Sequence, residues 1–421
     1  MVDKMINIKS PELLAPAGNP DCLKTAVDFG ADAVYIGGEL FTMRTSPDNF
    51  SFEELCKGIE YAHNAGVRVY LTCNTLPRNN EINRLPAFFE QAAACRADAL
   101  IISDIGVLTM AATALSDVEL HVSTQLGVVN HLTASALYNM GASRVVTARE
   151  LSLEEISEIR AKAPKELEIE AFVHGSMCVS YSGRCLLSNY MTGRDANRGD
   201  CAQPCRWKYA LMEETRPGQY FPVIEDESGT HILNSKDLCM AEHIADLYNA
   251  GISSFKIEGR AKAEYYVALT TNAYRYAIDS FISGEEKPEQ WIIDELYKIS
   301  HREYCTGFYY ENPSQVYSNG GYIRDYQVVG IVRGYDDGCI IVSQRNKFLK
   351  GDSLEILEPK SKPFKINCDK MYDDNSSEIE SAPHAMMTVK IPCETEVKSG
   401  SFVRKPTQVI PNQKASYRPL V

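Results

Sequence analysis

Short runs of β-branched and apolar residues alternate with helix-forming segments eight times along the first 282 residues. Alternation of this kind is typical of a parallel sheet whose strands are joined by helices. Eight repeats are the number that closes a β/α barrel. We therefore predict an α/β fold, a (β/α)8 barrel of the TIM type over residues 1–282. The predicted strands are Glu12–Leu14, Ala33–Ile36, Arg68–Thr72, Ala99–Ile102, Glu119–Val122, Arg144–Val146, Ile169–Phe172 and Phe255–Ile257.

The first predicted turn argues against an open, doubly wound sheet. Open sheets that bind dinucleotides carry a glycine-rich turn after the first strand. Here the turn is Ala15–Asn19, which has a single glycine. Polar residues directly follow several predicted strands, and the carboxyl ends of barrel strands are where barrels build their sites. We expect the functional site at that end.

The connection between the seventh and eighth strands is far longer than an ordinary βα loop. We predict that residues 175–237 form a cysteine-rich insertion at the site end of the barrel. Residues 283–325 are expected to be a linker with one helix, Trp291–Ile299. Residues 326–421 contain short β-rich runs separated by turn residues, which predicts a small antiparallel β-barrel. This second domain is a possible RNA-contacting module.

Composition and charge narrow the location and the partners. Hydrophobic residues make up 44% of the chain and charged residues 24%, which is ordinary for a soluble globular protein. No run approaches the roughly 20 apolar residues of a membrane span, and the start of the chain lacks the layout of a signal peptide. We expect a cytoplasmic protein with no membrane partner. The net charge of −13 argues against nonspecific coating of nucleic acid.

Thirteen cysteines need an explanation other than disulfides, because disulfides are rare in the cytoplasm. Four of them, Cys178, Cys185, Cys201 and Cys205, crowd into the predicted insertion. Grouped thiolates suit an iron–sulfur cluster or a structural zinc ion. The other nine are expected to be small, buried, hydrophobic residues. They are Cys22, Cys56, Cys73, Cys95, Cys239, Cys305, Cys339, Cys368 and Cys393.

The spacing of the four grouped cysteines favours a cluster and leaves zinc and free thiols open. Structural zinc usually uses a pair of cysteines two residues apart, whereas six residues separate the first pair here and three the second. A [4Fe-4S] cluster is larger and takes four thiolates. A radical S-adenosylmethionine enzyme is excluded, because Lys208 stands where its motif needs a third cysteine.

The residues before Cys178 resemble a known family. The segment Glu170–Cys178, EAFVHGSMC, is similar to the signature of the collagenase-like peptidase family, family 32 of the unclassified peptidases. Other segments that resemble this family are the opening ELLAPAGNPDCLKTAVDFGADAVYIGG, the run STQLGVVN, Asn234–Leu238 and Phe255–Arg260. The resemblance covers the barrel from end to end and extends into the C-terminal module.

The resemblance implies oxygen-independent hydroxylation rather than proteolysis. Bacterial members of the family hold a [4Fe-4S] cluster on four cysteines that match Cys178, Cys185, Cys201 and Cys205, and take the hydroxyl group from prephenate. Branches act on the wobble uridine of tRNA, on a ribosomal RNA cytidine or on a ubiquinone precursor. Length and the C-terminal module make this chain most similar to the tRNA branch, which forms 5-hydroxyuridine. The implied partners are the tRNA anticodon loop and prephenate, and a partner protein of the same family stays an open option.

Polar residues near the strand ends and aromatic residues of the insertion are the candidates for the reaction. We assign catalytic roles to His174, Glu258 and Arg260, at the ends of the seventh and eighth strands. Arginine suits the two carboxylates of prephenate, and aromatic faces stack on an unpaired base. The predicted substrate-binding residues are Arg44, His121, Gln125, Arg149, Tyr181 and Trp207. A purely structural role is the competing interpretation for each.

Two other functions compete with hydroxylation. A protease, as the family name suggests, has little support, because no histidine begins an H-E-x-x-H motif. His174 could act as a base for Cys178 only without a cluster. A zinc-stabilised adaptor for RNA or protein would use the same four cysteines without doing chemistry. The metal content of the purified protein distinguishes these functions. Iron would indicate hydroxylation, zinc would indicate the adaptor, and the absence of metal would reopen the question of proteolysis.

Overall fold

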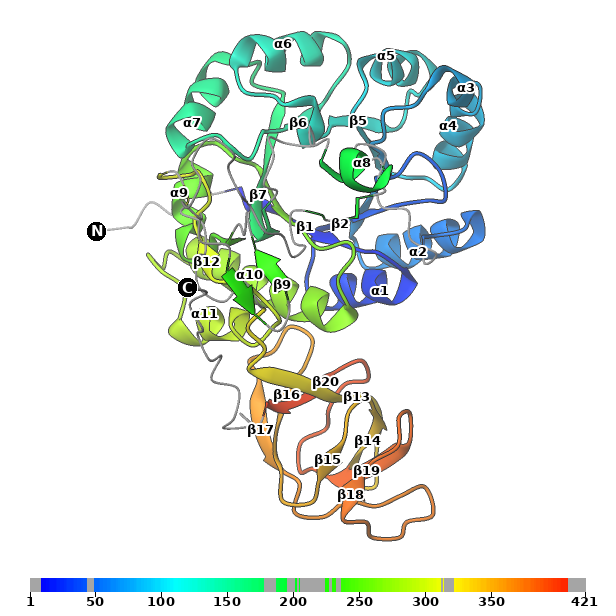
Figure 1. Ribbon diagram of the computed structural model, residues 1–421, viewed down its shortest axis with the longest axis vertical. Helices are drawn as coiled ribbons and strands as arrows, with labels where there is room; N and C mark the ends of the chain where they lie inside the picture. Colours follow the sequence, from blue (N-terminus) through cyan, green and yellow to red (C-terminus); the bar gives the residue numbers. More distant parts are fainter. Residues whose placement is uncertain are drawn as a thin grey trace, which may run out of the picture. The chain divides into compact units, whose positions relative to one another are not determined.

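Eight parallel strands form a closed ring in the computed structural model (Figure 1). The ring runs in the order β11-β1-β2-β3-β4-β5-β6-β7, and β11 also pairs with β7, which closes it. The predicted (β/α)8 barrel is confirmed. Its strands are β1 (Glu12–Pro16), β2 (Ala33–Ile36), β3 (Arg68–Cys73), β4 (Ala99–Ile102), β5 (Glu119–Val122), β6 (Arg144–Val146), β7 (Glu168–Ser176) and β11 (Ser254–Ile257).

The structure describes residues 9–43, 49–177, 187–194, 201–202, 204, 224–226, 229–231, 236–311, 313 and 322–407. Most of the predicted insertion 175–237 lies outside these ranges. The chain divides into two units. The unit with the barrel combines residues 1–207, 232–294 and 303–316, and the second unit combines 208–231, 295–302 and 317–421.

Helices lie around the outside of the ring, and polar caps begin several of them (Figure 1). Asn19 accepts a hydrogen bond from the backbone of α1, and Ser51 and Ser152 form capping boxes with Glu54 and Glu155. Such caps satisfy the free N–H groups of a first turn. No helix in the described ranges is both long and apolar enough to span a membrane. The barrel helices are α1 (Pro20–Asp28), α2 (Phe52–Asn64), α3 (Asn79–Ile82), α4 (Leu85–Ala94), α5 (Ile105–Ala114), α6 (His131–Asn139), α7 (Leu153–Lys162), α9 (Ile244–Asn249) and α10 (Glu264–Ile282).

The middle of the ring is filled by side chains. Alternate residues of a strand point to opposite faces, so each barrel strand sends every second residue inward. The central layer consists of Leu14, Ala33, Tyr35, Tyr70, Ala99 and Ile101. Because this layer packs the interior, only the two ends of the ring can hold a site.

Two short strands extend the sheet beside the ring. β10 (Asp237–Cys239) runs antiparallel to the end of β7 and pairs Cys239 with His174. β12 (Tyr304–Cys305) then runs parallel to β10. The sequence pattern does not predict either strand, because each has only two or three residues. The pairing supports β7 as far as Ser176, directly before the cysteine-rich segment.

The second unit contains a curved antiparallel sheet in the order β17-β16-β20-β13-β14-β19. Its core includes Val329, Val342, Ile356, Val389 and Val403, all fully buried. The predicted antiparallel β-structure is confirmed, in the form of a half-barrel. Its strands are β13 (Tyr326–Asp336), β14 (Cys339–Gln344), β16 (Ser353–Leu357), β17 (Phe364–Asn367), β19 (Thr388–Pro392) and β20 (Phe402–Pro406), with β15 (Phe348–Leu349) and β18 (Ser381–Ala382) as a separate pair.

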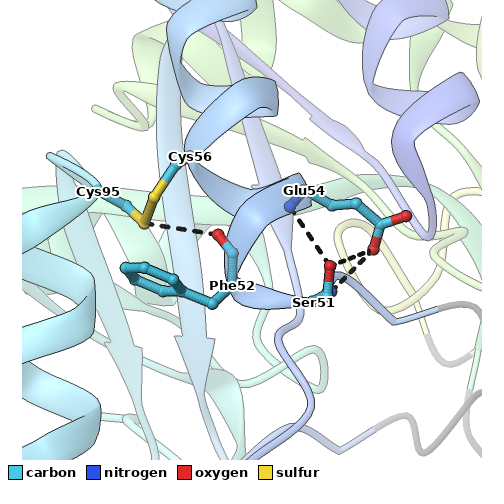
Figure 2. Close-up of a disulfide and its surroundings, with 5 residues drawn as sticks. All are labelled: Ser51, Phe52, Glu54, Cys56 and Cys95. Carbon is cyan, nitrogen blue, oxygen red and sulfur yellow. Dashed lines mark hydrogen bonds between the residues drawn. A yellow bond between two sulfur atoms is a disulfide. The ribbon is translucent and has the colours of Figure 1, made fainter.

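Two of the scattered cysteines are joined in a disulfide. Figure 2 shows Cys56 of α2 linked to Cys95, which follows the last residue of α4, beside the capping box of Ser51 and Glu54. The expectation that all the scattered cysteines are reduced is therefore wrong for this pair. Packing of α2 against the end of α4 brings the two residues together, and sequence spacing carries no sign of it. The expected burial is confirmed for the free thiols Cys22, Cys73, Cys368 and Cys393.

Candidate functional site at the carboxyl end of the barrel

His174 lies near the end of β7 among aromatic rings. Its ring centroid is 5.4 Å from those of Tyr274 and Tyr304 and 6.0 Å from that of Tyr266. The side chain is 1% exposed, and Nδ1 lies 3.4 Å from the hydroxyl oxygen of Tyr274. That hydroxyl donates its proton to the carbonyl oxygen of Val173 over 2.6 Å, so it faces Nδ1 as an acceptor. Tyr274 therefore favours the tautomer of His174 with the proton on Nδ1.

Arg149 and Glu258 form an ion pair beside the end of β7. The Nη2 atom of Arg149 lies 2.9 Å from Oε2 of Glu258, and Nη1 donates to the carbonyl oxygen of Ser176 over 3.0 Å. The guanidinium also lies 3.8 Å over the ring of Phe172. A planar guanidinium can make all three contacts at once. The structure thus brings together two predicted site residues that follow different strands, β6 and β11.

Arg260 is buried at the same end of the ring, 6% exposed. Its Nη1 atom donates to Oγ1 of Thr72 over 2.8 Å, and the hydroxyl of Thr72 lies 2.9 Å from that of Thr42. A Cβ atom on Gly37 would come within 2.5 Å of the same Nη1 atom. The absence of a side chain at Gly37 therefore leaves the space that the guanidinium occupies. Arg260 joins the strand ends of β2, β3 and β11.

Gln125 lies in the 3-10 turn η1 (Thr124–Leu126) after β5. Its Oε1 atom accepts hydrogen bonds from the hydroxyl groups of Ser103 over 2.8 Å and Ser123 over 2.5 Å. Its Nε2 atom donates to the backbone carbonyl oxygen of Asn74 over 3.3 Å. The half-buried amide is therefore held by the carboxyl ends of three neighbouring strands, β3, β4 and β5.

His121 belongs to a charged cluster at the opposite, amino end of the ring. It is fully buried, its Nε2 atom lies 3.2 Å from Oε2 of Glu119, and its ring packs edge-on against Tyr70. Burial lowers the pKa of His121, which opposes protonation. Because Glu119 is the first residue of β5, the imidazole points away from the residues at the carboxyl end.

Arg144 and Glu170 form the centre of that charged cluster. Arg144 makes ion pairs with Glu12 and Glu168, each at 2.6 Å, and with Glu170 at 3.1 Å. Glu170 is also 2.7 Å from Nζ of Lys256. Burial opposes ionisation of Glu170, but Lys256 and Arg144 outweigh it and lower its pKa to about 2. Arg144, Glu12 and Glu168 each begin a strand, so the cluster lies at the amino end of the barrel, the end that contributes to stability rather than to catalysis.

Six of the predicted site residues lie outside the part of the chain that the structure describes. They are Arg44, Cys178, Tyr181, Cys185, Cys205 and Trp207. Of the four grouped cysteines, only Cys201 lies within the described ranges, and it is half-buried. Within the described ranges, His, Cys, Asp and Glu side chains form no group of three or more that could hold a metal ion.

Several residues that build this end of the barrel are missing from the predicted set. Thr72, Ser103 and Ser123 are polar residues at inward positions where strands end, a signal that the sequence does contain. Tyr274, by contrast, lies in the middle of α10, and nothing in its sequence context points to His174. Its role depends on a contact across 100 residues of chain.

Together these features define a class of protein, a closed β/α barrel with a polar, partly cationic site at the carboxyl ends of its strands and a C-terminal β-module. Residues 18–319 match the model of Peptidase family U32, and residues 324–404 match that of the Peptidase family U32 C-terminal domain. The chain belongs to Peptidase family U32.

Relatives within the family carry different names. The tRNA hydroxylation protein P1 of Bacillus subtilis (strain 168) is 36% identical over 410 residues, which are 96% of each chain. An uncharacterized protease of Methanocaldococcus jannaschii is 46% identical over 358 residues, 82% of this chain and 86% of the relative. A 23S rRNA 5-hydroxycytidine synthase of Escherichia coli (strain K12) is 35% identical over 299 residues, 69% of this chain and 44% of the relative.

Proposed function

We propose that this protein hydroxylates RNA and that its substrate is the wobble uridine of tRNA, which it converts to 5-hydroxyuridine. The observation that carries the proposal is the match with the Bacillus subtilis tRNA hydroxylation protein, which covers 96% of both chains at 36% identity. The ribosomal RNA synthase is matched over only 44% of its length. The match with the tRNA hydroxylation protein includes both the barrel and the C-terminal module of this chain, which favours a tRNA substrate over a ribosomal one.

The carboxyl end of the barrel offers groups that suit an unpaired nucleotide. Arg149, Arg260 and Gln125 place guanidinium and amide donors around the strand ends. A base must leave its stack to reach such a site, and an anticodon loop presents bases that are already unpaired. Donors fixed by neighbouring hydrogen bonds can hold such a base with little reorganisation.

We further propose that Cys178, Cys185, Cys201 and Cys205 hold a [4Fe-4S] cluster. Among the four cysteines, Cys201 is the one that the structure describes, and its half-buried side chain is consistent with a cluster ligand that is partly shielded from water. The backbone N–H of Ala202 donates to Oγ of the buried Ser188 over 3.0 Å, which ties Cys201 to α8 (Leu187–Thr192). Met177, directly before Cys178, is 7% exposed at the end of β7. A bound cluster would supply electron transfer or polarisation of a neighbouring group.

Prephenate is the proposed co-substrate and the source of the hydroxyl group. Replacing the hydrogen on carbon 5 of uracil by a hydroxyl group removes two electrons from the ring, and the donor that loses its hydroxyl accepts them. Prephenate carries two carboxylates, for which guanidinium groups are suitable partners. Arg260 and Arg149, whose guanidinium groups lie at the carboxyl end of the barrel, are the candidates for binding these carboxylates. His174, whose Nδ1 atom faces the hydroxyl group of Tyr274, is the candidate for transferring a proton during the reaction.

Anaerobic purification followed by analysis of metal and nucleosides tests this function. We expect about four iron atoms and four sulfides per chain, and 5-hydroxyuridine in tRNA that disappears when the gene is deleted. Cys201→Ser should lower both iron content and 5-hydroxyuridine. Cys22→Ser, which changes a buried free thiol elsewhere in the barrel, should lower neither. Unchanged 5-hydroxyuridine in the deletion strain would exclude tRNA hydroxylation, and one zinc ion without iron would favour the adaptor.

Proteolysis is the second candidate function, because the Methanocaldococcus jannaschii relative at 46% identity is named a protease. A thiol protease needs a cysteine beside a basic imidazole. Incubating cluster-free protein with denatured collagen tests it. Cleavage that Cys178→Ser abolishes would support proteolysis, whereas intact substrate would exclude it for this substrate class.

A further inference from the structure

We propose that the amide of Gln125 makes the site accept uridine and reject cytidine. The inference rests on the proposed hydroxylation of RNA and names the group that chooses between its two pyrimidine substrates. Uracil and cytosine differ at position 4 of the ring, where uracil has a carbonyl oxygen that accepts a hydrogen bond and cytosine has an amino group that donates one. A side chain that can only donate therefore distinguishes them.

The orientation of the Gln125 amide follows from one neighbour that can only accept. The backbone carbonyl oxygen of Asn74 lies 3.3 Å from the amide nitrogen. If the amide were turned over, its oxygen would face that carbonyl oxygen, and two acceptors would oppose each other. The nitrogen of Gln125 must therefore point toward Asn74 and the oxygen toward the two serines.

The amide oxygen of Gln125 has no remaining capacity. A carbonyl oxygen has two lone pairs, and the hydroxyl groups of Ser103 and Ser123 donate to it over 2.8 and 2.5 Å. Both serines are nearly buried, 2% and 5% exposed. Water competes poorly for these hydroxyl groups, so the oxygen stays saturated. Gln125 presents no acceptor to a substrate.

The amide nitrogen, in contrast, has one N–H group left. It carries two protons, and the contact with Asn74 uses one of them. Among the described residues, it has no second acceptor within hydrogen-bond distance. Gln125 is half-buried and follows β5 directly, so this N–H group lies at the end of the barrel where the substrate is expected to bind.

The position of this donor is rigid. Gln125 belongs to a 3-10 turn, and the neighbouring Thr124 donates from Oγ1 to the carbonyl oxygen of Thr147 after β6 over 2.9 Å. With the contacts to β3 and β4, the turn is held by the ends of three other strands. A cytosine amino group placed here would oppose a second donor that cannot rotate away. Such an unpaired donor discriminates by a factor of about 10 to 100.

Gln125→Glu tests the inference, because it keeps the size of the side chain and replaces the amide donor with an acceptor. It also removes the hydrogen bond to the Asn74 carbonyl oxygen, so Gln125→Met, which removes the donor without adding an acceptor, is measured beside it. Two tRNAs that differ only in uridine or cytidine at the modified position are mixed and given to the holoenzyme without oxygen. The ratio of 5-hydroxyuridine to 5-hydroxycytidine is then measured by mass spectrometry. The unmodified protein should form 5-hydroxyuridine almost alone, and the variant should lower the ratio by about tenfold or more. Gln91→Glu, the same change on the exposed side of α4, should leave the ratio unchanged.

A ratio that Gln125→Glu leaves unchanged overturns the inference. If Gln125→Glu forms neither product, Gln125→Met decides, since it removes the donor without adding charge and should also lower the ratio. If both variants are inactive, the dissociation constants of each variant for the two tRNAs are measured instead. A variant that prefers the uridine tRNA as strongly as the unmodified protein does overturns the inference. Absence of 5-hydroxyuridine with the unmodified protein is a different result, which contradicts the proposed function itself.

Discussion

The Nη1 atom of Arg260 donates a hydrogen bond to Oγ1 of Thr72 over 2.8 Å, although 188 residues of chain separate them. The contact joins the end of β11 to the end of β3, across the carboxyl end of the ring. Both residues are almost fully buried, at 6% and 2% exposed. A buried guanidinium depends on such partners, because water cannot replace them.

Thr72→Val should therefore destabilise the barrel. The substitution keeps the shape of the side chain and removes the acceptor for Arg260, which costs about 1–3 kcal/mol when a buried donor loses its partner. Denaturant unfolding measures the change. Thr109→Val, at an exposed position of α5, should change stability by less than about 0.5 kcal/mol. Equal effects of the two variants would show that the contact contributes nothing.

The ion pair of Lys256 and Glu170 should make the free energy of unfolding decrease as the pH falls below 4.5. The pKa of Glu170 is about 2 in the folded protein, against an ordinary 4.5, so folding favours its charged form. This stabilisation is present above pH 4.5 and is lost as the pH falls toward 2. Unfolding free energies of the wild type and Lys256→Met, measured between pH 7 and pH 3, should converge as the pH falls.

At pH 7 the same Lys256→Met variant should lose about 3–5 kcal/mol, because it leaves a buried carboxylate with fewer partners. Adding Glu170→Gln removes that charge and should recover part of the loss. A double variant that is no more stable than Lys256→Met would contradict the role of the pair. Comparison at one protein concentration and salt concentration keeps screening constant.

The disulfide predicts a linked pair of peptides. Digestion of unreduced protein should yield a fragment that contains both Cys56 and Cys95, and reduction should split it. The bond closes a loop across 39 residues, so its loss through Cys56→Ser with Cys95→Ser should cost about 2–4 kcal/mol. Complete alkylation of both cysteines in native, unreduced protein would contradict the bond. Cys73, a buried free thiol, serves as the internal control for alkylation after unfolding.

Arg149→Lys should impair the reaction although it keeps the charge. The guanidinium reaches Glu258, the Ser176 carbonyl oxygen and the Phe172 ring together, and an ammonium group cannot reproduce that planar arrangement. We expect at least about a tenfold loss of 5-hydroxyuridine, as for a misplaced catalytic geometry. Arg84→Lys, an exposed residue before α4, should retain full activity. Full activity of Arg149→Lys would reduce the guanidinium to a structural role.

Local sequence patterns were sufficient to predict the strands of the barrel. They were insufficient to predict the side-chain contacts between distant strands. Predicted strands such as Ala99–Ile102 and Glu119–Val122 agree with the observed limits, because β-branched runs bounded by polar residues reflect local preferences. The register of the closed ring, by contrast, decides that Arg260 meets Thr72. No local pattern encodes a contact between residues so far apart.

His121 shows the same limit at the level of one side chain. Its position near the end of the fifth predicted strand led us to assign it to the substrate-binding residues, but its side chain is fully buried beside Glu119, the first residue of β5. Which end of the barrel the imidazole approaches depends on the charges that surround it. Glu119 and Tyr70 hold it at the amino end, and only the assembled ring brings those groups together.

The pairing of β1 with β11 has a consequence for synthesis of the chain. Glu12 and Ser254 are partners in that pairing and stand 242 residues apart. On a ribosome, β1 therefore emerges long before its neighbour and presents an unpaired edge, which is prone to wrong association. The barrel can close only after the whole cysteine-rich segment has left the exit tunnel. Closure is thus expected to be late and slow, and variants that delay it should depend more strongly on chaperones than the wild type does.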